Sequence, residues 1–278
     1  MRHSNFILIY WKKEQKVFNK NFEVLSNGTD KKAVHDTRVA IKKLRACLKL
    51  YAIITEKKGW QNLFTETKKL FAVLGKERDV EMCLELLIDD EKESKQDYTN
   101  IKNYLQSILQ TMQEWSLHAL KNYHKTKLAE LTSLLSEGAD TVTKEWLIEK
   151  TIEVINNHLK QVKDYYKQPH KIRKILKDVY YWLKMLPKNV LSDDSPEKKL
   201  EGILDDFGNW QNDEMLLTRI KHFRKDNLPG SFGEYDSLKT LEKKVEERKE
   251  KLLKDVLHKT KQLPKKISMV KMKKRSAS

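Results

Sequence analysis

The sequence is poor in residues that interrupt helices or cross-link small folds. It contains eight glycines and five prolines among 278 residues, and this scarcity favours long helices over turn-rich β structure. Its two cysteines, Cys47 and Cys83, cannot build a disulfide framework, and their spacing does not match a metal site. These shortages indicate a helical protein of a reducing compartment.

Long hydrophobic runs are missing as well. The apolar run from Phe6 to Trp11 is shorter than the core of a signal peptide and far too short to cross a bilayer. No other segment approaches the roughly 18 apolar residues that a membrane span needs. We therefore expect a cytoplasmic protein without a membrane span, with enough residues for one large domain or two small ones.

Acidic residues are too few to balance the basic ones. The chain has 56 lysines and arginines against 40 acidic residues, which gives a formal net charge of +16 at pH 7. Such an excess indicates a polyanionic partner or an anionic surface. The sequence contains no G-x-x-x-x-G-K-[ST] loop, no H-E-x-x-H motif and no carboxylate cluster at helical spacing beside its basic segments. It therefore predicts a binding protein without a metal or a cofactor rather than an enzyme.

Helical periodicity dominates the chain, and we predict an all-α fold of long antiparallel helices without strands. Asp30 stands where it can cap the second helix. We expect Leu74-Gly75 and Phe207-Gly208 to interrupt the helical pattern. The predicted helices span 5–25, 31–55, 60–73, a segment from about 79, 97–122, 123–136, 143–166, 170–186, a segment from about 195, 212–226 and 235–262.

The second half of the sequence resembles the first. Residues 169–186 align with 34–51 at an offset of 135, and residues 207–220 align with 74–87 at an offset of 133. Three matching blocks in the same order predict a duplicated helical unit. The third block pairs His118, Lys121 and Lys125 with Arg248, Lys251 and Asp255 at an offset of 130.

This repetition predicts two pseudo-symmetric helical bundles packed about a pseudo-twofold axis. We assign residues 1–262 to one domain, with repeat one at about 5–137 and repeat two at about 141–262. The remaining tail, residues 263–278, is basic: residues 261–278 contain seven cations and no acid. We expect it to be disordered, because it has too little apolar surface to bury.

The segment VHDTRVAIKKLRACLKLY, residues 34–51, places its cations on one side of a helix. They recur at spacings of three and four within an arc of about 80°. The row is roughly 21 Å long, with neighbouring cations about 5–6 Å apart, a spacing that suits a chain of phosphates. The row consists of Lys31, His35, Arg38, Lys42, Arg45 and Lys49, and the opposite side carries Ala33, Thr37, Ile41, Leu44, Leu48 and Tyr51.

These residues resemble the CHAD domain family (conserved histidine α-helical domain). The family motif H-x-x-R-x-x-x-[KR]-[KR]-L-R is matched from His35 to Arg45, and its L-G-x-x-[RW]-[DH]-D-like segment is matched from Leu74 to Asp79. A looser second copy runs from His170 to Lys177 and from Phe207 to Asp213. The resemblance covers about residues 5–262.

The resemblance implies a cytoplasmic protein, associated with polyphosphate granules, that binds inorganic polyphosphate in a central basic groove. Two departures weaken the second half of that site: Tyr180 replaces an expected arginine, and Asn212 replaces an expected aspartate. Lys174 supplies replacement charge nearby. The candidate polyphosphate-binding residues are Lys31, His35, Arg38, Lys42, Lys43, Arg45, Lys49, Arg78, His118, Lys121, Lys125, His170, Arg173, Lys174, Lys177, Tyr180, Lys184, Lys244, Arg248 and Lys251.

Other interpretations stay open. The basic rows are also compatible with a solvated surface, and Asp79 and Asp213 with helix capping. Nucleic acid could bind through nonspecific charge, although the rows lack interleaved aromatic residues for base stacking. A metal-dependent phosphohydrolase acting on polyphosphate or a nucleotide would need carboxylates assembled from distant segments, such as Asp79 with Asp213. Trp182 and Trp210 are expected in the core.

Overall fold

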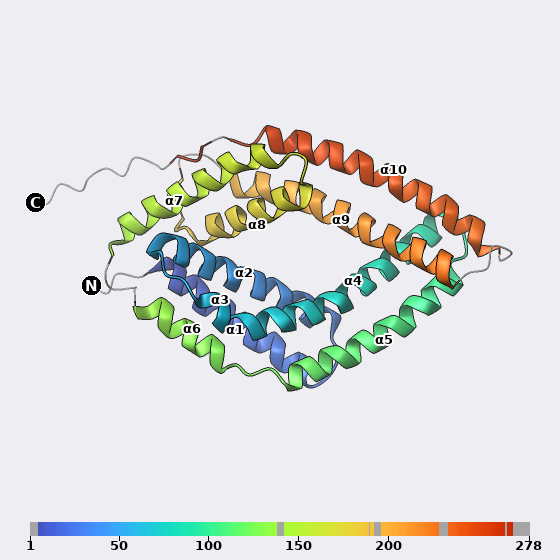
Figure 1. Ribbon diagram of the computed structural model, residues 1–278, viewed down its shortest axis with the longest axis horizontal. Helices are drawn as coiled ribbons and strands as arrows, with labels where there is room; N and C mark the ends of the chain where they lie inside the picture. Colours follow the sequence, from blue (N-terminus) through green and yellow to red (C-terminus); the bar gives the residue numbers. More distant parts are fainter. Residues whose placement is uncertain are drawn as a thin grey trace, which may run out of the picture.

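The computed structural model describes residues 5–137, 142–188, 190–191, 196–227, 233–264 and 266–268. All regular elements of these residues are helices, as the periodicity predicts, and Figure 1 shows their arrangement. The helices are α1 (Phe6–Ser26), α2 (Lys31–Thr55), α3 (Trp60–Leu63), α4 (Thr65–Ser94), α5 (Thr99–Lys121), α6 (Thr126–Glu137), α7 (Lys144–Gln161), η1 (Val162–Tyr165), α8 (Pro169–Met185), α9 (Pro196–Asp226) and α10 (Glu234–Lys261).

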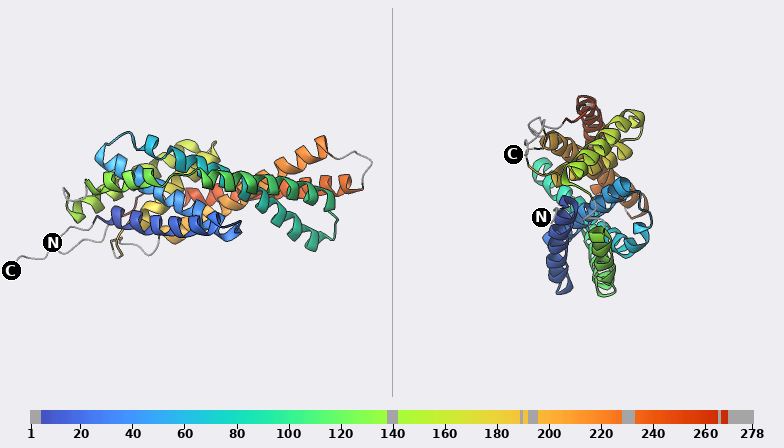
Figure 2. Two further views of the ribbon diagram at one scale, coloured as in Figure 1. Left: turned by 90° about the horizontal axis from the view of Figure 1, so that it is seen from below. Right: turned by 90° about the vertical axis from the view of Figure 1, so that its left-hand side faces the viewer.

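The molecule is elongated (Figures 1 and 2). Its buried apolar side chains form two hydrophobic cores. The larger core lies between α1, α2, α6, α7 and α8, and it includes Trp11 and Trp182 with no exposed surface. The smaller core joins the far halves of α4 and α9 to α5 and α10. Helices α4 and α9 therefore belong to both cores and connect the two ends.

Helices α4 and α9 are continuous where the sequence predicted breaks. Both Leu74-Gly75 and Phe207-Gly208 lie inside helices. The expectation of a break at each glycine was wrong, because one glycine costs a helix only about 1 kcal/mol and packing against two cores outweighs that cost. The break instead falls at Phe64, between α3 and α4.

Most other helix boundaries are confirmed within a few residues. Asp30 caps α2, with its Oδ1 accepting a hydrogen bond from the Ala33 backbone N–H at 2.5 Å. The predicted helix at 143–166 ends earlier, because η1 follows α7 after Gln161. None of the helices in the described part of the chain combines the length and the apolar character needed to cross a membrane.

Ile267, in the basic tail, packs against the helices. Ile267 is buried, its backbone N–H donates to Asn156 Oδ1 at 2.7 Å, and its carbonyl accepts from Asn156 Nδ2 at 3.0 Å. The expectation of a disordered tail beginning at 263 is therefore wrong for Ile267, because this residue joins the larger core. Residues 269–278 lie outside the described residues.

Candidate functional site

A groove of about 650 Å³ opens between α2 and α4 on one side and α8 and α9 on the other. We call it the basic groove. Helices α4 and α9 line it where they pass from the larger core to the smaller one. Cations from α2 and α8 form most of its charged lining: His35, Arg38, Lys42, Arg45 and Lys49 come from α2, and Arg173, Lys174 and Lys177 come from α8.

All members of the predicted cation row on α2 except Lys31 therefore face one cavity. The opposite side of α2 is buried in the larger core, including Ile41, Leu44 and Leu48. Helix α8 likewise has one apolar face and one basic face, and Ile172, Val179 and Leu183 on its apolar face are buried. Amphipathic packing of both helices forces their two basic faces toward each other.

Six basic side chains of the groove have no carboxylate partner in the part of the chain that the structure describes. Within the described residues, no Asp or Glu oxygen lies within ion-pair distance of Arg38, Lys42, Arg45, Arg173, Lys174 or Lys177. Like charges held together in this way repel one another. A polyanion bound in the groove would relieve that repulsion.

Arg38 is fixed against α4. Its Nη1 donates a hydrogen bond to the Phe71 carbonyl at 2.8 Å, and its guanidinium carbon lies 4.5 Å from the centre of the Phe71 ring. The guanidinium passes so close to Gly75 that a Cβ there would lie 2.3 Å from Arg38 Nη1. A glycine inside α4 thus allows the guanidinium to reach the helix backbone.

Lys42 and Lys177 have strongly lowered pKa values, because they are buried beside other cations. Burial, followed by the charges of Lys42 and Arg173, lowers the pKa of Lys177 to about 6. Burial, followed by Arg38 and Arg173, lowers the pKa of Lys42 to about 8. Burial and the neighbouring Arg78 likewise lower the pKa of His35. The empty groove therefore holds less positive charge at neutral pH than its residue types indicate.

Carboxylates lie at the margins of the groove. Asp178 pairs with Lys49, and Arg78 Nη1 lies 3.0 Å from Glu81 Oε2, so these two cations are partly neutralised. Asp79 also lines the groove. Burial raises the pKa of Asp79, against the opposing effect of Arg38 and Arg219.

The α8 side of the groove is built differently. Arg173 Nε is buried and has no hydrogen-bond partner among the described residues. A side cavity of about 380 Å³ adjoins the groove here and shares Arg173, Lys177 and Tyr181 with it. Tyr180 lines this side cavity, and its hydroxyl donates a hydrogen bond to Glu201. Gly208 also lines the side cavity, and unlike Gly75 it is not approached by a side chain: a Cβ on Gly208 would meet no atom within 4 Å.

The remaining predicted residues lie outside the basic groove, most of them in other contacts. Lys31 pairs with Glu85, Lys43 with Glu14, His170 with Glu214, Lys184 with Glu201, Lys244 with Asp90 and Arg248 with Asp213. Lys125 lies over the Phe22 ring, while His118, Lys121 and Lys251 are exposed. Asp213 is buried by its pair with Arg248, and Trp182 and Trp210 are in the core, as expected.

Sequence reasoning missed the uncharged lining of the groove. Phe71 lies under Arg38, Lys42 and Arg45, at 4.5, 5.9 and 6.0 Å from its ring centre. Phe71, Gly75, Arg78 and Met82 follow one face of α4 at spacings of four, three and four. That row could have been recognised if α4 had been predicted as continuous. Trp60, Tyr181, Gln211 and Met215 also line the groove.

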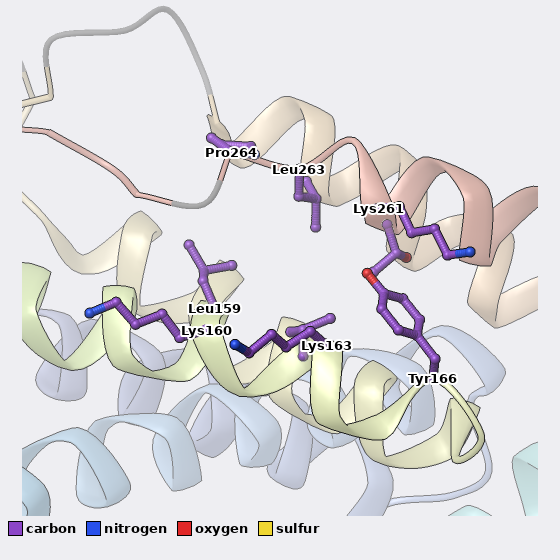
Figure 3. A pocket seen from close by; sticks show the side chains of 9 residues that line it. Leu159, Lys160, Lys163, Tyr166, Lys261, Leu263 and Pro264 are labelled. Carbon is purple, nitrogen blue, oxygen red and sulfur yellow. The ribbon is translucent and has the colours of Figure 1, made fainter.

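A smaller cavity of about 230 Å³ lies elsewhere, between the end of α7 with η1 and the end of α10. Figure 3 shows Lys160, Lys163 and Tyr166 on one side, with Leu263 and Pro264 on the other. None of the candidate residues lines it. Within the described residues, no group of three or more His, Cys, Asp or Glu side chains has a metal-binding arrangement.

Comparison with known proteins identifies the fold and the family. The CHAD domain model matches residues 10–221. The crystal structure of the CHAD domain from the plant Ricinus communis superposes with a TM-score of 0.73 at 14% sequence identity, covering 96% of this chain and 94% of that one. No curated protein sequence matches. With most of its length matched by the family model, the chain belongs to the CHAD domain family.

Proposed function

We propose that the protein binds inorganic polyphosphate in the basic groove. The observation that carries this proposal is a group of six basic side chains that two facing helices direct into one cavity. None of the six has a carboxylate partner among the described residues. Elsewhere, many cations of the same candidate set pair with acids, so the lack of partners in the groove is a local feature. Membership of a family commonly linked to polyphosphate binding supports the same ligand.

The chemistry of the groove suits phosphate oxygens. Arginine binds a phosphate through two parallel hydrogen bonds, and lysine binds it as a point charge. Arg173 has a buried Nε without an acceptor among the described residues, so a phosphate oxygen would satisfy a group that is costly to leave unpaired. Cations from both α2 and α8 would contact one bound chain.

Inorganic polyphosphate fits the groove better than nucleic acid does. One of the aromatic rings that line the groove, Phe71, is covered by cations of α2, which limits its stacking with a base. Nonspecific binding of nucleic acid would come from the net charge alone. We also propose that the protein binds its ligand without turnover, in the cytoplasm and on polyphosphate granules.

A titration with long-chain polyphosphate tests this function. We expect tight binding that weakens as salt rises, and little displacement by a mass excess of single-stranded RNA. Neutralising Arg38, Lys42 and Arg173 with glutamine should remove most of the affinity. Equal competition by RNA, or unchanged affinity in that triple variant, would contradict the proposal.

A further inference from the structure

Lys177 is open to small molecules from two sides. It lies on α8 and lines both the basic groove and the side cavity. Within the described residues, no carboxylate oxygen lies within ion-pair distance of its Nζ. The side chain is therefore not held by an acid, and its amine faces space that a ligand can enter.

The groups around Lys177 are predominantly positive. Helix α2 contributes Arg38, Lys42 and Arg45, α8 contributes Arg173 and Lys174, and α4 contributes Arg78 with Asp79. The other nearby acids are Asp178, which holds Lys49, Glu201, which holds Tyr180 and Lys184, and Asp205, which is exposed at the side cavity. Tyr181 is uncharged, because burial raises its pKa to about 12.

This environment keeps the amine of Lys177 in its neutral form. Burial and the adjacent cations lower its pKa to about 6, so the amine is unprotonated at neutral pH. An unprotonated lysine is a nucleophile, and desolvation beside another cation is an established way to activate one. The pKa of Lys184, two turns further along α8, shifts in the opposite direction. Burial lowers it, but hydrogen bonds with Tyr180 and Glu201 outweigh burial and raise it.

The same surroundings select the electrophile. Arg173 lies one turn before Lys177 on α8, with its Nε buried and without a partner among the described residues, and Arg45 faces it from α2. Guanidinium groups that line the same groove as a nucleophile would bind the phosphate of a reagent and hold its reactive carbon nearby. The pairing of a phosphate-binding group with a neutral amine suits a phosphorylated electrophile.

We propose that Lys177 is a modification site at which small acyl phosphates transfer their acyl group to the lysine amine. The Nζ lone pair attacks the carbonyl carbon, a C–N bond forms and the C–O bond to phosphate breaks. Inorganic phosphate leaves with that electron pair and accepts the proton that the amine releases. The product is an amide, which cannot take up the proton that a bound polyanion would favour on the amine; the effect of the modification on polyphosphate binding rests on the proposed function.

Site-resolved acylation rates test the proposal without any polyphosphate present. The full chain is treated with acetyl phosphate, or with the neutral donor N-hydroxysuccinimide acetate, between pH 7 and 9 at constant ionic strength. Acetylation of each lysine is then measured by mass spectrometry. At pH 7 we expect Lys177 to react at least about tenfold faster than Lys184 with either donor, because most of its amine is unprotonated.

The pH profile distinguishes a neutral amine from a merely accessible one. We expect the Lys177 rate to stay nearly constant from pH 7 to 9, while the Lys184 rate rises about tenfold per pH unit. A Lys177 rate that rises in parallel with Lys184, or that does not exceed it at pH 7, would overturn the proposal.

The variant Arg173→Gln tests guidance by phosphate, with rates compared at pH 9, where Lys177 is neutral with or without Arg173. We expect at least about a threefold slower reaction of Lys177 with acetyl phosphate and an unchanged rate with the neutral donor, because only the former carries a group that Arg173 binds. Equal rates of the variant and the unmodified sequence with acetyl phosphate would overturn the assignment of acyl phosphates.

Discussion

At the scale of single residues, Arg38 and Gly75 define the α4 wall of the basic groove. The guanidinium donates to the Phe71 carbonyl, and the missing Cβ of Gly75 leaves the space that it occupies. A side chain fixed in this way loses less conformational entropy when it binds a ligand. Gly75 therefore affects the groove through the position of Arg38.

The substitution Gly75→Ala should weaken polyphosphate binding by about threefold to tenfold, because the displaced Arg38 must be ordered again on binding. The melting temperature should change little, since the new methyl group meets only the far end of a flexible side chain and alanine favours the helix. Gly202→Ala is the matched control, because a Cβ on Gly202 in α9 meets no atom within 4 Å. Calorimetric titration of both variants measures the effect; equal affinities would show that the Arg38 contact is irrelevant.

Lys42 and Lys177 make binding dependent on pH. Their pKa values in the folded protein, about 8 and about 6, lie below the value of 10.5 for a free lysine. A bound polyanion favours the protonated amines, so binding should take up about one proton at pH 7.5 and strengthen as pH falls from 9 to 6. Titration in buffers of different ionisation enthalpy counts the protons. Lys177→Arg, which stays charged, should flatten the pH dependence.

The same depressed pKa values predict the pH dependence of stability without ligand. Between about pH 6 and 10.5 the unfolded chain holds protons on these lysines that the folded groove has released. The contribution of these two lysines to the free energy of unfolding should therefore rise with pH across this window. Denaturation of the unmodified protein and of the Lys42→Gln, Lys177→Gln variant at pH 6.5 and 9 measures the contribution. A pH dependence identical in both proteins would contradict it.

At the scale of helices, local patterns were predictable and distant partners were not. The cation row on α2 follows from spacing within a single helix, and the structure directs the row from His35 to Lys49 into one cavity. The face of α4 that carries Phe71 was missed because a glycine was taken as a break. Packing against two cores keeps α4 continuous, and a local propensity argument does not include that energy.

Ion pairs between distant helices explain why several candidate residues lie outside the groove. Lys244 Nζ lies 2.7 Å from Asp90 Oδ1, and the two residues are 154 positions apart. Lys43 is next to the cation row on α2 in sequence. Its Nζ nevertheless lies 3.0 Å from Oε2 of Glu14, a residue that is only 1% exposed. Sequence spacing shows which face of its helix a cation occupies, but only the packed fold shows which acid that face meets.

Arg248 illustrates this structural role. Its Nε donates to Asp213 Oδ2 at 2.9 Å, and Asp213 is 2% exposed. The substitution Arg248→Met should destabilise the protein by about 1–3 kcal/mol, because a buried carboxylate loses its partner while the exposed side of the pair is screened by solvent. Polyphosphate affinity should change little below the melting transition. Chemical denaturation and titration measure the two effects; loss of affinity without loss of stability would place Arg248 in the binding site.

At the scale of the whole molecule, the two cores hold the groove between them. Helices α4 and α9 are anchored at both ends, so packing on either side of the groove offsets the repulsion among its cations. Contacts between these cations and phosphates should make the binding affinity depend on salt concentration. If all six cations contact phosphates, the logarithm of the affinity should fall with the logarithm of salt concentration with a slope of about −4.

Titrations at several salt concentrations measure that slope. Each glutamine substitution among the six should reduce its magnitude by about 0.7. Substitution of Lys251, which is exposed and outside the groove, should leave the slope unchanged. A slope near zero would mean that the groove cations do not contact the ligand.

The measurement that tests the account most directly compares two double variants of equal net charge. Lys42→Gln with Arg173→Gln removes two groove cations, and Lys121→Gln with Lys251→Gln removes two exposed cations outside it. Each lowers the formal charge from +16 by two, to +14. We predict that long-chain polyphosphate binds the groove variant at least about a hundredfold more weakly, two lost phosphate contacts at about 1.5 kcal/mol each, and the control variant almost unchanged. Equal affinities of the two variants would contradict the claim that the groove is the binding site.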